Sequence, residues 1–251
     1  MQTEIVTSLH DQALKLRVRD MLLNALAVSS GAIDAISFLA LGKVFSAFMT
    51  GNIAFLGLRV AGANAPGWVS ILVSMAAFAV GVYLSARIVR PPEGSEMWPQ
   101  RVTVALGISL IAHAAFLVVW FSSNGQPSTD VAHVLLGLWG LAMGMQSAAV
   151  RTLHVDGVFT TAATATIIFL VGDLTNWSAT VEERRRLAGV LVSLFVGASA
   201  GGLLLVRAQM YAPVLPFVIT LGVVATAAIA LRERGAEGSK MARPSAIRGG
   251  L

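Results

Sequence analysis

Apolar residues run along this chain in long stretches that short polar segments separate. A membrane-spanning helix needs about 20 predominantly apolar residues. Six stretches meet that length, namely residues 20–41, 68–89, 102–122, 131–150, 187–206 and 213–231. The pattern predicts an all-α fold: a polytopic bundle of membrane helices in which residues 20–231 form a single transmembrane domain.

Two further apolar stretches, residues 44–61 and 158–177, are interrupted by Thr, Gly, Asn and Asp. Backbone that is not helical is tolerated at membrane depth only where protein or a water-filled cavity surrounds it. Each stretch is therefore either a broken, partly re-entrant segment or a shorter complete span. The chain would have six spans in the first case and eight in the second.

The positions of the basic residues distinguish these two topologies. With six spans, 15 of the 18 Lys and Arg residues are cytoplasmic, and only Lys43, Arg59 and Arg207 lie outside. With eight spans the division becomes 12 against six. Because cytoplasmic loops carry an excess of Lys and Arg, six spans are favoured and both termini are cytoplasmic. Residues 1–19 are then a cytoplasmic N-terminal segment, and residues 232–251 a basic tail that is expected to be disordered.

The two interrupted stretches resemble each other. When residue 44 is set against residue 158, VFSAFMTGNIAFL aligns with VFTTAATATIIFL and six of 13 positions are identical. Each stretch follows one predicted span and precedes two, as a duplicated unit would. We therefore expect two repeats, at about 20–122 and 131–231. Three true spans in each half would make the repeat inverted, although chance similarity between apolar sequences is the alternative.

Composition supports a lipid environment and excludes several classes of protein. Only 12% of the residues are charged and 56% are hydrophobic, whereas soluble domains average about 25% charged residues. The net charge of +5 comes from residues at the ends of the apolar stretches, so no nucleic acid partner is expected. The chain contains no cysteine, which excludes disulfides. Basic residues before Met21 resemble a secretory signal, but the run that follows exceeds signal length, which favours a retained helix.

Polar residues inside the two interrupted stretches are the candidate binding residues. Thr50, Gly51 and Asn52 combine a hydroxyl, a flexible backbone and a carboxamide. They are interpreted either as substrate contacts or as a hydrogen-bonded knot between helices. The second stretch offers a hydroxyl surface that would oppose the first; its members are Thr160, Thr161, Thr164 and Thr166. The alternative, favoured for at least two of these four threonines, is that they bond back within their own helix.

Asp34 lies in the middle part of the first predicted span. A carboxylate at that depth costs about 2.5 to 3.5 kcal/mol on insertion scales, so it is expected to face the protein interior. Two functions remain open for it. It either carries a proton or a cation, or it has a structural role, paired with Arg151 or protonated against polar neighbours.

Residues 197–201 match the G-x-S-x-G pattern of serine hydrolases. A nucleophile elbow joins a strand to a helix, whereas this run lies inside a predicted span. Small residues at four-residue spacing, which recur at Gly140 and Gly144, allow membrane helices to approach closely. The run therefore favours helix packing, either within the chain or in a homo-oligomer. No other catalytic motif and no cofactor or metal site is predicted, so an intramembrane enzyme ranks last.

The stretch GAIDAISFLALGKVFSAFMTGNIAFLG, residues 31–57, resembles the YoaK-like bacterial membrane proteins, a group of unknown function. GMQSAAVRTLHVDGVFTTAATAT resembles the second block of that group, in which a Thr-Gly pair is usual and Thr164 is followed here by Ala165. The resemblance implies a bacterial inner-membrane protein with about six helices. It implies no activity.

The favoured function is a transporter or permease for a small polar solute, with a site between inverted repeats near the bilayer midplane. That site would consist of Asp34, Thr50, Gly51 and Asn52 opposite Thr160, Thr161 and Thr164. The rival hypothesis is a non-transporting helper or scaffold protein that binds partner helices through small-residue faces. The first predicts a polar cavity that water can reach, and the second predicts an exposed groove of Gly and Ala.

Overall fold

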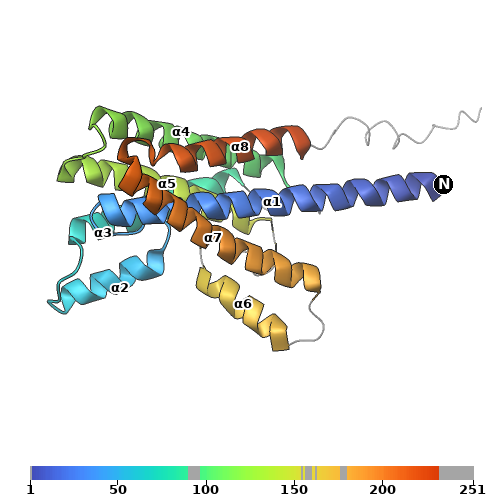
Figure 1. Cartoon of the computed structure of the whole chain (residues 1–251), viewed down its shortest axis with the longest axis horizontal. Helices are drawn as coiled ribbons and strands as arrows, with labels where there is room; N and C mark the ends of the chain where they lie inside the picture. Colours follow the sequence, from blue (N-terminus) through green and yellow to red (C-terminus); the bar gives the residue numbers. More distant parts are fainter. Residues whose placement is uncertain are drawn as a thin grey trace, which may run out of the picture.

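The computed structural model describes residues 2–89, 97–153, 155, 160–161, 163–175 and 180–231, and these are all helical or in connections between helices. Within them lie eight α-helices and one 3-10 turn, η1, and no strand. The helices are α1 (Gln2–Ala40), α2 (Met49–Val60), α3 (Trp68–Ile88), α4 (Gln100–Ser122), α5 (Thr129–Arg151), α6 (Ala163–Thr175), α7 (Val181–Arg207) and α8 (Val214–Ala230), with η1 at Gln209–Tyr211 (Figure 1). The predicted tail, residues 232–251, lies outside the described residues.

Six of these helices are long and apolar enough to cross a membrane, and they coincide with the six predicted spans. The polytopic helical bundle is therefore confirmed. Two helices extend beyond the apolar pattern: α1 begins at Gln2 and α7 begins at Val181. The start of α7 has a local cause, a capping box in which Glu183 N donates to Thr180 Oγ1 and Thr180 N donates to Glu183 Oε2.

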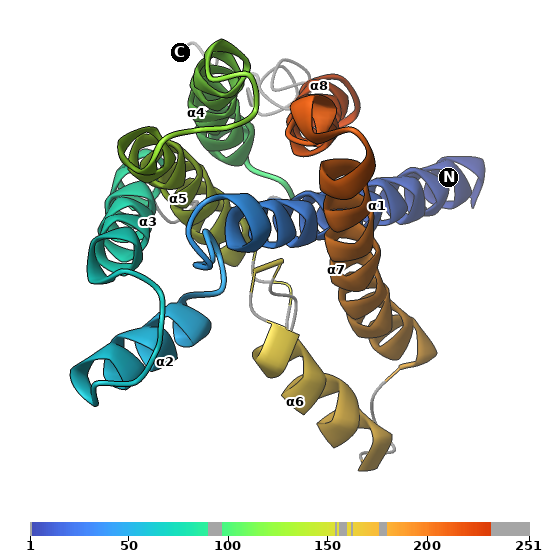
Figure 2. The ribbon, with the colours of Figure 1, turned by 60° about the vertical axis from the view of Figure 1, so that its left-hand side comes forward.

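The two interrupted stretches form the short helices α2 and α6, of 12 and 13 residues. At 1.5 Å per residue they are about 18 to 20 Å long, less than the roughly 30 Å of a bilayer core. Both lie on one side of the bundle and run outward toward its opposite ends (Figures 1 and 2). Their first residues, Met49 and Ala163, occupy the same position in the alignment of the two stretches.

Helices from the two halves of the chain interleave. The first long helix of each half packs along the third helix of the other, so that α1 lies against α7 and α5 against α3. The contact between α1 and α8 likewise matches that between α5 and α4, and α2 packs on α3 as α6 packs on α7. This matched pattern of pairings is what an internal repeat predicts.

Glycines allow the two main helix crossings to be close. At the α1–α7 crossing, a Cβ on Gly197 would meet the backbone of Val28. At the α3–α5 crossing, a Cβ on Gly144 would meet the backbone of Phe78. Gly31 and Gly81 are similarly close to backbone of a partner helix, and Gly140 and Gly201 also lie against partner backbone at somewhat longer distances. The small-residue faces predicted from the sequence are thus covered by the chain's own helices, while a homo-oligomer stays a prediction.

Candidate functional site

Residues 41–48, between α1 and α2, form the first of two breaks between helices in the bundle. The side chain of Asp34 on α1 accepts hydrogen bonds from this segment. Ser46 N and Ala47 N donate to Asp34 Oδ1 at 2.9 and 2.8 Å. One turn further along α1, Ser37 Oγ lies 2.8 Å from Ser46 Oγ. A carboxylate that accepts backbone N–H bonds in this way satisfies donors that a broken helix leaves without partners. Asp34 therefore has a structural task besides any role in binding.

Asn52 of α2 forms hydrogen bonds with the same segment, at Phe45 rather than at the residues that Asp34 binds. Its Oδ1 accepts from Phe45 N at 3.0 Å, and its Nδ2 donates to Phe45 O at 2.7 Å. Ser74 of α3 also donates to Phe45 O, at 2.6 Å. The Asn52 side chain is fully buried. Both backbone groups of Phe45 are thus satisfied away from water, as buried backbone groups require.

The second break lies between α5 and α6, and side chains of α5 form hydrogen bonds with it. Gln146 Nε2 donates to Thr160 Oγ1 at 3.3 Å, and Ser147 Oγ lies 2.9 Å from Thr161 Oγ1. Gln146 Nε2 also lies 3.3 Å from Leu26 O of α1. In the alignment of the two stretches, Thr160 and Thr161 take the places of Ser46 and Ala47. Both halves therefore bind equivalent residues to their first long helix, the first half through a carboxylate and the second through neutral groups.

A cavity of about 580 Å³ lies where the two breaks meet α1 and α7. Phe45 and Phe48 reach it from the segment before α2, and Thr161 and Ala163 from the start of α6. Asp34 lines it from α1. Its volume is within the range of about 300 to 1,000 Å³ that is usual for small-molecule pockets. The starts of both short helices thus border one cavity.

Only two of the seven candidate residues line this cavity, Asp34 and Thr161. Thr160 is buried, whereas Thr50 and Thr164 are exposed on the short helices. Gly51 lies against the rings of Phe45 and Phe48, where a Cβ would meet both rings. Of the candidate residues, Asp34 and Thr161 are therefore placed to contact a ligand in the cavity. The others are buried, packed against rings or exposed elsewhere on the short helices.

One structural interpretation from the sequence, the pairing of Asp34 with Arg151, is wrong. No salt bridge joins Asp34 to Arg151 in the described part of the chain, and Arg151 is exposed. Thr160 and Thr161 do not bond back within their own helix, because they precede α6 and bond to α5. The residues that bind these breaks include Ser37 of α1 and Ser147 of α5, small hydroxyl residues that composition does not mark as special.

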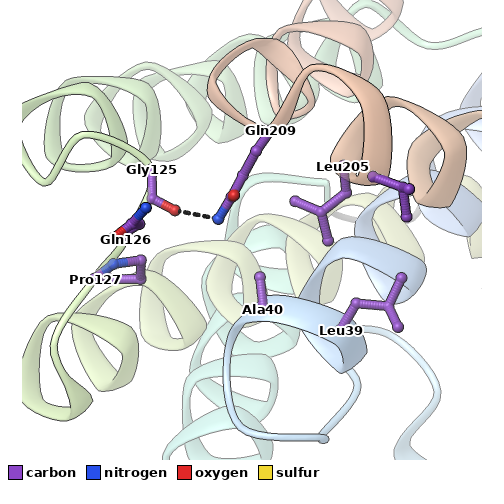
Figure 3. Close-up of a pocket in the computed structure, with 8 residues that line it drawn as sticks. Leu39, Ala40, Gly125, Gln126, Pro127, Leu205 and Gln209 are labelled. Carbon is purple, nitrogen blue, oxygen red and sulfur yellow. Dashed lines mark hydrogen bonds between the residues drawn. The ribbon is translucent and has the colours of Figure 1, made fainter.

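A second cavity, of about 460 Å³, lies at one end of the bundle. The last residues of α1, the α4–α5 connection and the end of α7 surround it (Figure 3). Gln209 Nε2 donates to Gly125 O at 2.7 Å across it, and Trp120 Nε1 donates to Met210 O at 3.1 Å nearby. None of its lining residues is ionisable. These hydrogen bonds join α4 and the connection before α5 to η1. We therefore interpret this region as a structural contact that fixes the connections at one end of the bundle, and not as a binding site.

The G-x-S-x-G run lies inside the continuous helix α7. Gly197 and Gly201 face α1, while Ser199 is on the exposed side of α7. The sharp turn that a nucleophile elbow requires is therefore absent at this position. Packing explains these glycines.

Comparisons with known proteins place this helical bundle among proteins without an assigned activity. A family model described as "Protein of unknown function (DUF1275)" matches residues 22–227. The chain is similar to the UPF0700 transmembrane protein YoaK of Bacillus subtilis, with 32% identity over 158 residues, which cover 63% of this chain and 68% of the relative. No solved structure matches the chain.

Proposed function

The chain belongs to the DUF1275 family, and we propose that it is a small-solute transporter or permease of the bacterial inner membrane. The solute site in this proposal is the cavity between the two breaks, with Asp34 and Thr161 as its polar contacts. Both termini are cytoplasmic in this arrangement, in accord with the distribution of basic residues.

One observation carries the proposal: the two halves each break their helix, and both breaks border the same cavity. Breaking a helix at membrane depth exposes backbone groups whose burial without a partner costs several kcal/mol each. The chain meets this with buried polar side chains such as Asn52. A continuous helix would need none of them. Broken helices around a shared site are the usual architecture of transporters with internal repeats.

The described lining of the cavity is apolar apart from Asp34 and Thr161, so it differs from the polar cavity that the transporter hypothesis predicted. The rival hypothesis of a scaffold protein also lacks its expected feature at the two main helix crossings. It requires an exposed groove of Gly and Ala, but Gly140, Gly144, Gly197 and Gly201 lie against backbone of the chain's own helices. These faces are not free to bind a partner helix.

Cysteine labelling tests whether water reaches the cavity from both sides of the membrane. Because the chain has no native cysteine, Ala35→Cys and Thr161→Cys each introduce one thiol into the cavity lining. We expect a charged, membrane-impermeant methanethiosulfonate to modify both thiols when it is added to either face of oriented vesicles. Access from both faces is expected because a permease opens its site to each side in turn.

Leu135→Cys provides the matched control, since Leu135 is fully buried in the core and its thiol should stay unmodified. Modification of the cavity thiols from one face only would contradict transport and favour a one-sided binding protein. No modification from either face would also count against the proposal.

The topology has its own labelling test. Single cysteines replace the exposed residues Asp11, Ala63 and Gln126, and an impermeant maleimide is added outside intact cells. Six spans place positions 63 and 126 on the side opposite to position 11, whereas eight spans place all three on the same side. We expect opposite sides because α2 is too short to span the membrane. Labelling of all three positions, or of none of them, would exclude the six-span topology.

A further inference from the structure

The lining of the cavity between the breaks combines aromatic rings with a single charge. Phe38, Phe45, Phe48 and Phe195 contribute rings, and the remaining lining residues are mostly Leu, Ala and Gly. Asp34 is the only ionisable residue of the lining within the described part of the chain. A ligand that fills this space therefore meets apolar surface almost everywhere and a carboxylate at one point.

Three of these rings, Phe38, Phe45 and Phe48, form a contiguous group. Phe38 and Phe45 are stacked with centroids 5.1 Å apart, and Phe48 packs edge-on against Phe45 at 5.2 Å. Phe55 of α2 stacks on Phe45 at 5.9 Å. Because each ring is held by a neighbour, little side-chain freedom is lost when a ligand binds. Ring faces attract cations, and Lys43 Nζ already lies 5.3 Å from the centroid of Phe38.

The charge of the cavity favours a cationic ligand over an anionic one. The starts of α2 and α6 each carry a partial positive charge of about half a unit, spread over several N–H groups and effective only within the first turn. In the connection before α2, the N–H groups of Ser46 and Ala47 are already bonded to Asp34. When Asp34 is ionised, its carboxylate places a full charge at one point on the lining. It is therefore the strongest local source of attraction for a ligand head group.

We infer that the cavity between the two breaks binds a lipophilic organic cation, whose apolar groups lie among the phenylalanine rings and whose positive centre lies near Asp34. The inference rests on the proposed function, because it names the class of solute for the same site. The aromatic group and the lone carboxylate are the two features that aromatic cages for substituted ammonium ions combine.

Binding of tetraphenylphosphonium to the purified full-length protein, measured by isothermal titration in detergent, tests the inference. Tetraphenylborate has nearly the same shape and the opposite charge, so it controls for partition into apolar surface. We expect the wild type to bind tetraphenylphosphonium at least about tenfold more tightly than tetraphenylborate. Equal binding of the two ions, or no binding of tetraphenylphosphonium, would overturn the inference.

Two variants locate the site. Asp34→Asn removes the charge but keeps an Oδ1 that accepts from Ser46 N and Ala47 N, and we expect at least about tenfold weaker binding. Phe38→Leu removes one ring and is expected to weaken binding by about threefold to tenfold. Asp130→Asn, at the start of α5, is the matched control and should bind as the wild type does. If Asp34→Asn fails to fold, Phe38→Leu decides, and unchanged binding by that variant would overturn the inference.

Uptake of tetraphenylphosphonium into proteoliposomes, measured with a selective electrode, separates this inference from the proposed function. Binding without uptake above protein-free liposomes would support the cation site and contradict transport of this ion. If the cavity thiols were labelled from both sides but tetraphenylphosphonium did not bind, the proposed permease function would still be supported. The inference that its solute is an organic cation would be overturned.

Discussion

Replacing Gly144 or Gly197 with alanine is expected to destabilise the protein by about 3 kcal/mol or more and to lower its Tm by about 10 °C. Each added Cβ would meet backbone of the partner helix, Phe78 in one case and Val28 in the other. Backbone in the middle of a helix cannot rotate away as a side chain can, so the whole crossing has to open. Thermal unfolding of the purified variants in detergent, followed by circular dichroism, measures the effect.

Gly222→Ala is the matched control for these two variants. Gly222 lies on α8, and a Cβ there would meet nothing within 4 Å. Its Tm should stay at or above that of the wild type, because alanine favours helix over glycine by up to about 1 kcal/mol. If all three variants lost the same stability, the close crossings would not be the cause.

Asn52→Leu should also destabilise strongly, by about 2 to 3 kcal/mol. Leucine leaves the N–H of Phe45 without its acceptor, and a buried donor without a partner costs about 1 to 3 kcal/mol. The carbonyl of Phe45 keeps its bond from Ser74, so the loss falls mainly on the N–H. A lower Tm is the expected measurement, together with easier proteolysis of the segment before α2.

Thr50→Val provides the comparison, two positions away on the same helix. Thr50 is exposed, and a surface substitution of this kind usually changes stability by no more than about 0.5 kcal/mol. A similar loss in both variants would show that α2 tolerates no change at all, and would contradict the specific role given to Asn52.

The sequence predicts the spans well because the membrane imposes a length on them. Six apolar runs became six long helices, and the two runs with polar interruptions became helices too short to cross. The four-residue glycine spacing at Gly197 and Gly201 correctly indicated close helix approach. These features are local, and each depends on residues that are neighbours along the chain.

The site was predicted less completely, because residue type does not reveal which partner a polar group has. The position of Asn52 inside an apolar stretch suggested a ligand contact, yet its carboxamide binds the backbone of Phe45. Asp34 was expected to face the interior, and it does line the cavity, but its backbone donors lie beyond the end of its own helix. Which helices cross, and hence which rings surround Asp34, depends on pairings between distant segments that apolar periodicity does not encode.

The interleaving of the two halves constrains how the protein is made. Helix α1 leaves the ribosome first, but α7, which supplies the glycines of its closest crossing, is synthesised near the end of the chain. Until α7 has been synthesised, Gly31 of α1 therefore lacks the helix against which it packs in the complete protein. Neither half contains a complete glycine crossing, so we regard the chain as one cooperative unit whose biogenesis finishes only when α7 inserts beside α1.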